Sequence, residues 1–183
     1  MKKLMFVLAM LLAFGTSAFS QKFFTRDAKI KFNSDTPMEK IEGVNKSATC
    51  VLDAATGKME WKVLIKGFLF EKALMQEHFN ENYLESSKYP NATFSGAITD
   101  LNEVNFAKDG TYTAKVKGKM TIHNVTKDVE TTGTIQVVGG NLEVQTNFGV
   151  ACADYDISIP SVVKDNIAKE IKVMVNAVLK PMK

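Results

Sequence analysis

The feature that most constrains the fold is a strict alternation of residue types between positions 112 and 122. The even positions are apolar or small (Tyr112, Ala114, Val116, Gly118, Met120 and Ile122), and the odd positions are lysines and threonines. A repeat of two residues places successive side chains on opposite faces of a β-strand. The run therefore predicts a strand with one face buried and the other in water.

The alternation resumes twice further along the chain. It runs in odd phase through Val129, Gly133, Ile135 and Val137, and then in even phase through Leu142, Val144, Phe148 and Val150. Each segment has the same period of two as the first strand. The three predicted strands therefore share one dry face.

The connections between these strands predict how they pair. Val125 tolerates a positive φ poorly, so we expect a four-residue loop over residues 123–126 that sets Met120 opposite Val129. Gly139-Gly140 suits a tight hairpin turn, which sets Ile135 opposite Val144. A slip of one residue in either hairpin would expose the apolar face, so the pattern restricts the register.

The first 20 residues have the pattern of a secretory signal peptide. Lys2 and Lys3 precede the apolar run Leu4 to Phe14, and Ala18-Phe19-Ser20 places small residues where a signal peptidase reads them. The alternative is a membrane anchor, but this run is too short to span a bilayer. We expect residues 1–20 to be removed, residues 21–183 to form a single β-barrel domain, and the protein to be periplasmic or secreted.

Charge and hydropathy exclude several classes of partner. Removal of Lys2 and Lys3 lowers the formal net charge from +3 to +1. A near-neutral chain with both signs interspersed lacks the basic patch of a nucleic-acid-binding protein, so no nucleic-acid partner is expected. No later stretch has the length and hydropathy of a membrane-spanning helix, so we do not expect an integral membrane protein. Transient membrane contact and a homodimer are left open.

Five further segments alternate, at residues 28–34, 43–53, 58–67, 92–101 and 171–179. Residues 71–84 instead have apolar side chains three and four positions apart, which predicts a short amphipathic helix. Eight alternating strands joined by hairpins, with one short helical excursion, favour an all-β fold, an eight-stranded antiparallel up-and-down barrel. A barrel of this size either fills with side chains or holds one small ligand.

Two glycines on the dry face bear on that choice. Gly118 and Gly133 lie in the middle of predicted strands, where glycine is destabilising and needs a reason. Either they form sharp corners of the barrel, or they leave room for a ligand. The residues alone leave both explanations open.

Two cysteines, Cys50 and Cys152, would lie in an oxidising compartment, where a disulfide is allowed. Each lies on an alternating strand among apolar neighbours, which favours two buried free thiols. A disulfide would require these remote positions to come within bonding reach.

Several motifs occur together in a fixed order. They are Phe68-Leu69-Phe70 followed by Leu74 to Glu81, then Tyr89 to Phe94, Gly118 to Lys127, and Asp154 to Ile157 with Pro160. In these motifs and their spacing the chain resembles the YceI-like family of lipid-binding barrels over nearly the whole mature chain. One departure is Asn124, where the family usually has glycine; asparagine also tolerates the left-handed region, which keeps the turn.

The resemblance implies a lipocalin-like barrel with an elongated cavity for a polyisoprenoid or another long-chain amphiphile, in secreted or periplasmic proteins. It favours the ligand explanation of the two glycines. The family has no agreed catalytic residues to transfer to this chain.

The residues themselves contain no catalytic or metal-binding pattern. The two histidines, His78 and His123, have no second ligand at metal-binding spacing. We place His78 on the inner side of the predicted helix, either simply packed or in contact with a lipid headgroup, and His123 in a solvated turn. Asp154 and Asp156 fit structural roles in a turn. We expect no enzyme, no metal and no cofactor other than a bound lipid.

The leading hypothesis is non-catalytic binding, storage or transport of a long-chain amphiphile, such as a polyisoprenoid, an isoprenoid quinone or a fatty-acid-like lipid, in the cell envelope. The residues predicted to line its cavity are Trp61, Val63, Ile65, Phe68, Phe94, Ile98, Val116, Gly118, Met120, Gly133, Ile135, Val144, Phe148 and Val173. The alternative is a ligand-free structural or stress-response barrel with a packed interior. An enzyme acting on a bound lipid is a third, weaker hypothesis.

Overall fold

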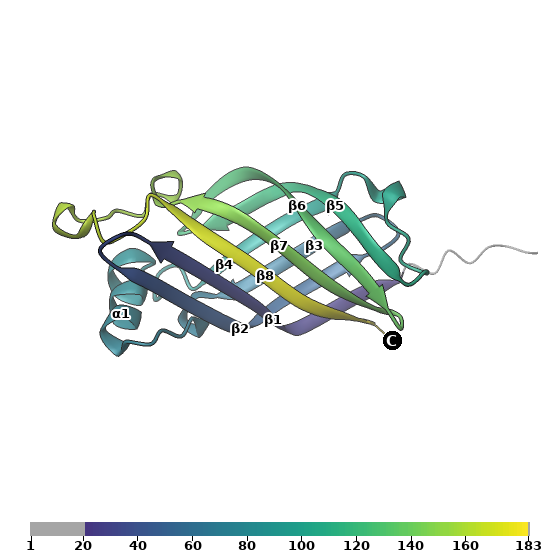
Figure 1. Cartoon of the computed structure of the whole chain (residues 1–183), viewed down its shortest axis with the longest axis horizontal. Helices are drawn as coiled ribbons and strands as arrows, with labels where there is room; N and C mark the ends of the chain where they lie inside the picture. Colours follow the sequence, from purple (N-terminus) through teal and green to yellow (C-terminus); the bar gives the residue numbers. More distant parts are fainter. Residues whose placement is uncertain (1–20, 183) are drawn as a thin grey trace, which may run out of the picture.

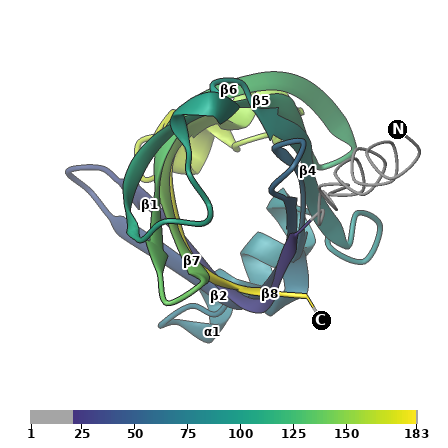
Figure 2. The same ribbon diagram turned by 90° about the vertical axis from the view of Figure 1, so that its right-hand side faces the viewer.

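The computed structural model describes residues 21–182; the predicted signal peptide lies outside the described residues. The strands are β1 (Lys22–Asp35), β2 (Lys40–Asp53), β3 (Lys58–Leu64), β4 (Asn91–Ile98), β5 (Gly110–Ile122), β6 (Val125–Val138), β7 (Asn141–Ala151) and β8 (Glu170–Pro181). Each strand pairs with the next, and β8 pairs with β1, so the sheet closes on itself (Figures 1 and 2). The predicted eight-stranded antiparallel barrel with one short helix is confirmed.

The turn between β5 and β6 is tighter than predicted. His123 and Asn124 have φ angles of +50° and +65° and form a two-residue turn, after which Ile122 pairs with Val125 and Gly118 with Val129. The predicted four-residue loop and the predicted pairing of Met120 with Val129 are therefore wrong. Because His123 and Asn124 alone form the turn, Val125 lies after it and does not need a positive φ. The register error is two residues, so every side chain stays on its predicted face.

The turn between β6 and β7 agrees with the prediction. Gly139 and Gly140 have φ angles of +54° and +77°, and Ile135 pairs with Val144. Glycine reaches these angles at little cost, which explains the tight hairpin at this position.

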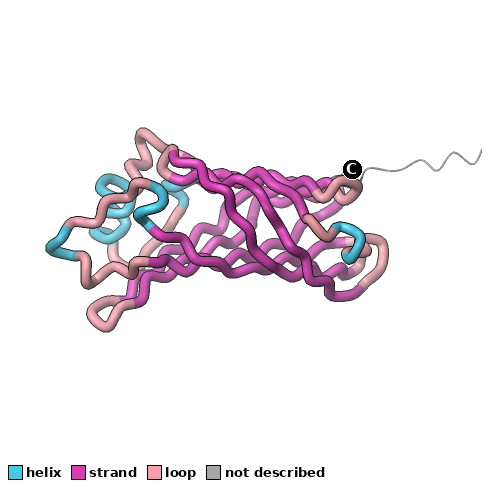
Figure 3. Tube along the Cα trace, turned by 90° about the horizontal axis from the view of Figure 1, so that it is seen from above, coloured by secondary structure: helices cyan, strands magenta, loops and turns pink. Residues whose placement is uncertain are grey.

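The connection from β3 to β4 covers one end of the barrel (Figures 1 and 3). It contains a 3₁₀ turn (Ile65–Gly67), α1 (Ala73–His78) and a π-helical turn (Phe79–Tyr83), so the α-helix is shorter than the predicted 71–84. The Phe79 ring stacks on Phe32 of β1, with centroids 5.4 Å apart, and lies 5.0 Å from the ring of Phe70. These aromatic contacts hold the helical excursion over the barrel end.

The remaining helical segments are single 3₁₀ turns at Leu101–Glu103, Cys152–Tyr155 and Ser161–Val163. The last two belong to the β7–β8 connection, which lies at the same end of the barrel as α1 (Figure 1). Among residues 21–182, no helix has the length and apolar character needed to cross a membrane.

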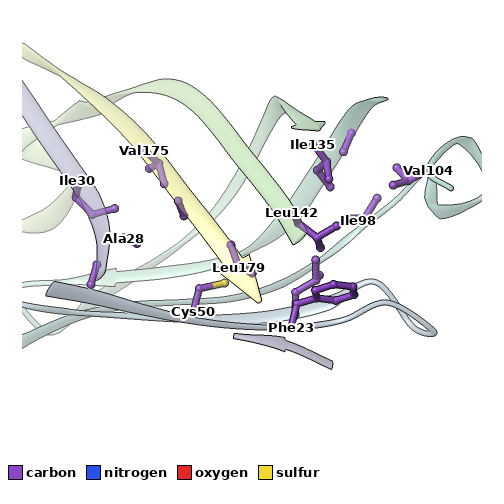
Figure 4. Close-up of a cluster of buried hydrophobic side chains, with 14 of the residues drawn as sticks. Phe23, Ala28, Ile30, Cys50, Ile98, Val104, Ile135, Leu142, Val175 and Leu179 are labelled. Carbon is purple, nitrogen blue, oxygen red and sulfur yellow. The ribbon is translucent and has the colours of Figure 1, made fainter. Parts of the chain in front are cut away.

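The opposite end of the barrel is solidly packed. Phe23, Leu52, Val137, Leu142 and Leu179 are each at most 2% exposed and come from five different strands. Figure 4 shows Phe23, Leu142 and Leu179 converging there. Burial of this apolar surface stabilises the closed barrel. We call this packed end the floor of the barrel.

Candidate ligand-binding cavity

Above this floor the barrel encloses a cavity of about 460 Å³. It runs from Cys50 and Leu179 to the aromatic side chains of Phe32, Phe68 and Phe79 beneath the helical end. Its wall is overwhelmingly apolar, and its volume falls in the usual range for small-molecule sites. The interior is therefore hollow rather than filled by side chains.

Most of the residues predicted to line the cavity do so. They are Trp61, Val63, Ile65, Phe68, Phe94, Val116, Met120, Gly133, Ile135, Val144, Phe148 and Val173. All but Ile65 and Phe68 occupy inward positions of the strands. Ile65 and Phe68 lie in and just after the 3₁₀ turn that follows β3. Their contact with a ligand remains a prediction.

Ile98 and Gly118 do not line the cavity, and these two predictions are corrected. Ile98 is 4% exposed and belongs to the packed core with Phe23 and Leu142. Gly118 pairs with Gly96 on β4. A Cβ atom at Gly118 would lie 2.7 Å from Cζ of Phe94 and would collide with the backbone oxygen of Ser95. Gly118 therefore permits close approach of two backbones beneath the Phe94 ring.

Gly133 lines the cavity but is also tightly placed. A Cβ atom there would lie 2.7 Å from the backbone oxygen of Gln145 and 3.0 Å from Cβ of Thr146. Close approach to β7 therefore explains this glycine, in place of the two explanations left open by the sequence.

The sequence analysis missed the contribution of the β7–β8 connection. Ile157, Ile159 and Ile167 line the cavity near its helical end. They lie in an irregular segment where no hydrophobic period exists to mark an inward face. Phe32 and Phe79 were also missed, although the alternation of β1 gives a signal for Phe32.

The two histidines lie elsewhere than expected. His78 is exposed and does not line the cavity, because the α-helix ends there and the following Phe79 points inward instead. The His123 side chain is only 12% exposed, so the expectation of a solvated residue is also wrong. Its Nε2 lies 2.9 Å from Oε2 of Glu85, and its Nδ1 lies 3.2 Å from the backbone oxygen of Tyr155.

Both cysteines line the cavity as free thiols. Burial raises the pKa of the Cys50 thiol far above its ordinary value, and burial also raises the pKa of Cys152. Both side chains are therefore neutral near pH 7 and act as small apolar groups in the wall.

The chemistry of the cavity suits an uncharged chain. Within residues 21–182, no group of three or more His, Cys, Asp or Glu side chains is placed to hold a metal ion. Inward-facing polar groups include the hydroxyls of Ser34, Thr131 and Thr146, which form hydrogen bonds without carrying charge. Such a site can bind an apolar chain by removing it from water.

A closed antiparallel barrel, packed at one end and hollow above, defines a ligand-binding β-barrel of the lipocalin-like type. The YceI-like domain family matches residues 14–179, and the chain belongs to this family. The resemblance drawn from the sequence motifs is thereby confirmed. No curated protein matches the chain.

Solved structures share the fold. A polyisoprenoid binding domain from Saccharophagus degradans, implicated in plant cell wall breakdown, is 12% identical with a TM-score of 0.77, over 89% of this chain and 99% of that one. BcnA of Burkholderia cenocepacia is 18% identical with a TM-score of 0.68, over 83% and 95%. The YCEI protein of Campylobacter jejuni is 19% identical with a TM-score of 0.55, over 75% and 81%.

Proposed function

We propose that this protein binds, stores or transports a long-chain amphiphile, such as a polyisoprenoid, an isoprenoid quinone or a fatty-acid-like lipid, without changing it chemically. The apolar cavity carries this proposal. Each methylene group moved from water into such a wall contributes about 0.8 kcal/mol. A chain of many methylenes therefore binds strongly without any charged contact.

The family and the neighbouring structures support a lipid ligand. The Saccharophagus degradans structure with the same fold is described as a polyisoprenoid binding domain. The hollow interior favours binding over the alternative of a ligand-free barrel with a packed core, because an empty apolar cavity is destabilising.

The placement of the ionisable side chains supports a non-catalytic role. His78 is on the outside, and both ring nitrogens of His123 face protein acceptors. Neither imidazole is positioned to transfer a proton to a molecule in the cavity.

The N-terminal pattern supports a periplasmic or secreted location. We expect the exported protein to begin near Gln21, after the small residues Ala18 and Ser20. Sequencing the N-terminus of protein from the cell envelope tests this. Recovery of an envelope protein that begins at Met1 would overturn the proposed cleavage.

Lipid mass spectrometry on solvent extracts of the purified protein tests the ligand. Val116→Phe adds an inward ring to the cavity wall, whereas Thr113→Phe places the same ring on the exposed outer face of β5. We expect long-chain lipid in the wild type and the Thr113 variant, and a clear loss of lipid in the folded Val116 variant. A wild-type protein that neither co-purifies with lipid nor binds added geranylgeraniol would contradict the proposal.

A further inference from the structure

The barrel wall is incomplete between β6 and β7. Their ladder runs from the pair Val138–Asn141 only as far as Gly133–Thr146. Both strands nevertheless continue, β6 back to Val125 and β7 on to Ala151, each still paired with its other neighbour. The two strands therefore form a fork, which can be followed in Figure 1. We call the gap between residues 129–132 and 146–149 the β6–β7 window.

The cavity reaches the outside through this window. Glu130 of β6 and Gly149 of β7 occupy outward positions in the unpaired stretch, yet both line the cavity. On β5 and β8, by contrast, only inward residues line it. Because the backbones of β6 and β7 separate where their ladder ends, outward residues there can border the internal space.

Both ends of the window are closed by protein. On one side is the last ladder pair, Gly133 with Thr146. On the other, Tyr155 is 3% exposed and belongs to a cluster with Val150, against which Val125 and Val129 pack. The opening is therefore confined to the middle of the wall, where the buried chain of a ligand would meet water.

Polar groups concentrate at this fork. The Thr131 and Thr146 hydroxyl oxygens lie 3.2 Å apart, and Thr146 Oγ1 donates a hydrogen bond of 3.0 Å to the backbone oxygen of Thr132. Thr146 Oγ1 therefore donates its hydrogen bond to Thr132 and accepts one from the Thr131 hydroxyl. The Thr131 oxygen keeps lone pairs free to accept a further hydrogen bond.

The charges at the rim are balanced. Glu130 pairs with Lys117 at 3.8 Å, and the Glu170 carboxylate lies over Gly149, which is opposite Lys172 in the ladder. Two carboxylates and two ammonium groups offer no net attraction to an anion. A phosphate headgroup would meet carboxylates as well as lysines at this rim, and desolvating it would be costly.

We propose that the β6–β7 window holds the polar headgroup of the bound amphiphile at Thr131 and Thr146, and that this headgroup is an uncharged hydrogen-bonding group such as an alcohol. The inference rests on the proposed lipid-binding function and adds the position and chemistry of the headgroup. The apolar chain lies in the cavity, and the headgroup faces water through the wall rather than through the helical end.

The first test compares three probes with the same branched chain: geranylgeraniol, geranylgeranyl monophosphate and the hydrocarbon that lacks the hydroxyl. We expect the wild type to bind the alcohol more tightly than either of the others. Thr131→Val should weaken alcohol binding about three- to tenfold and leave hydrocarbon binding unchanged. Thr113→Val is the matched control, because Thr113 is exposed on the outer face of β5. It should change the affinity for neither the alcohol nor the hydrocarbon.

The second test locates the headgroup directly. A geranylgeraniol analogue with a photoreactive group at the hydroxyl end should cross-link within residues 129–134 and 144–149. Cross-links confined to residues 70–84 would place the headgroup at the helical end and overturn the inference, as would tighter binding of the monophosphate. Failure of all three probes to bind the wild type would instead overturn the proposed function.

Discussion

His123 and Glu85 are 38 positions apart in the chain, yet Nε2 of the imidazole lies 2.9 Å from Oε2 of the carboxylate. Nδ1 of the same ring lies 3.2 Å from the backbone oxygen of Tyr155. Both partners are oxygen atoms, which can accept a hydrogen bond from a ring nitrogen. The His123 ring therefore links three loops at the helical end of the barrel.

Backbone strain accompanies this junction. Glu85, His123 and Asp156 have φ angles of +41°, +50° and +53°. The left-handed region costs a residue other than glycine about 1–2 kcal/mol. Such conformations persist only where surrounding contacts hold them, which here include the contacts of the His123 ring with Glu85 and Tyr155.

The first prediction concerns His123. His123→Phe keeps a ring but removes both hydrogen bonds, and we expect a loss of about 1–3 kcal/mol in the free energy of unfolding, measured by denaturant titration. Glu85 is 43% exposed, so solvent screening places Glu85→Gln nearer the lower value. Lys88→Gln is the control, since the exposed Lys88–Glu85 pair is 4.0 Å apart and contributes little. A His123→Phe variant as stable as the wild type would contradict this structural role of the ring.

The sequence predicted the barrel well because a half-buried strand imposes a period of two that can be read without any partner. Ile135 and Val144 could be paired in advance because Gly139-Gly140 leaves few turn geometries. The β5–β6 turn was misjudged because Asn124, and unexpectedly His123, adopt positive φ, and the stabilising partner Glu85 is remote in sequence.

The cavity was predicted less completely, for two physical reasons. Alternation identifies an inward side chain but not its depth, so it could not separate Ile98 in the packed floor from Val116 in the hollow. The inward isoleucines of the β7–β8 connection, such as Ile159, have no period at all. The β6–β7 window depends on where a ladder ends, and Thr131 and Thr146 look like ordinary strand residues.

The second prediction tests the two faces of β6 with one chemical change at adjacent positions. Ile135 is 3% exposed, whereas Gln136 points outward and is exposed. Ile135→Lys places an ammonium group in an apolar wall and should unfold the barrel or lower its stability by several kcal/mol. Gln136→Lys should stay within about 0.5 kcal/mol of the wild type. Equal tolerance of the two lysines in thermal melts would contradict the assignment of faces.

The third prediction concerns the close approach at Gly118. Gly118→Ala adds a Cβ atom against backbone atoms of β4, which cannot rotate away as a side chain can. Overpacking of this kind costs about 1–3 kcal/mol. Lys119→Ala, on the exposed face of the same strand, is the control. A Gly118→Ala variant as stable as the wild type, but with less bound lipid, would restore the view that this glycine leaves room for the ligand.

The last prediction uses the buried thiol of Cys50, whose pKa is raised by desolvation. Above about pH 9, the ordinary value, the thiol ionises in the unfolded chain but stays protonated in the folded barrel. The unfolded state then binds fewer protons, so the free energy of unfolding falls as pH rises, by up to about 1.4 kcal/mol per pH unit for this group. Cys50→Ala removes that dependence.

At pH 7 we expect Cys50→Ala to be less stable than the wild type, because the substitution leaves a small cavity. The difference in free energy of unfolding between the two proteins should shrink between pH 9 and pH 10. Denaturant titrations at each pH measure the free energy of unfolding. Tyr83 and Tyr155, whose pKa values burial also raises, are present in both proteins and cancel in the comparison. Cys152→Ala is the matched variant at a more exposed thiol. Its difference in free energy of unfolding from the wild type should shrink less over this pH range than that of Cys50→Ala. A constant difference between wild type and Cys50→Ala across this range would show that the Cys50 thiol ionises as readily in the folded protein as in the unfolded chain.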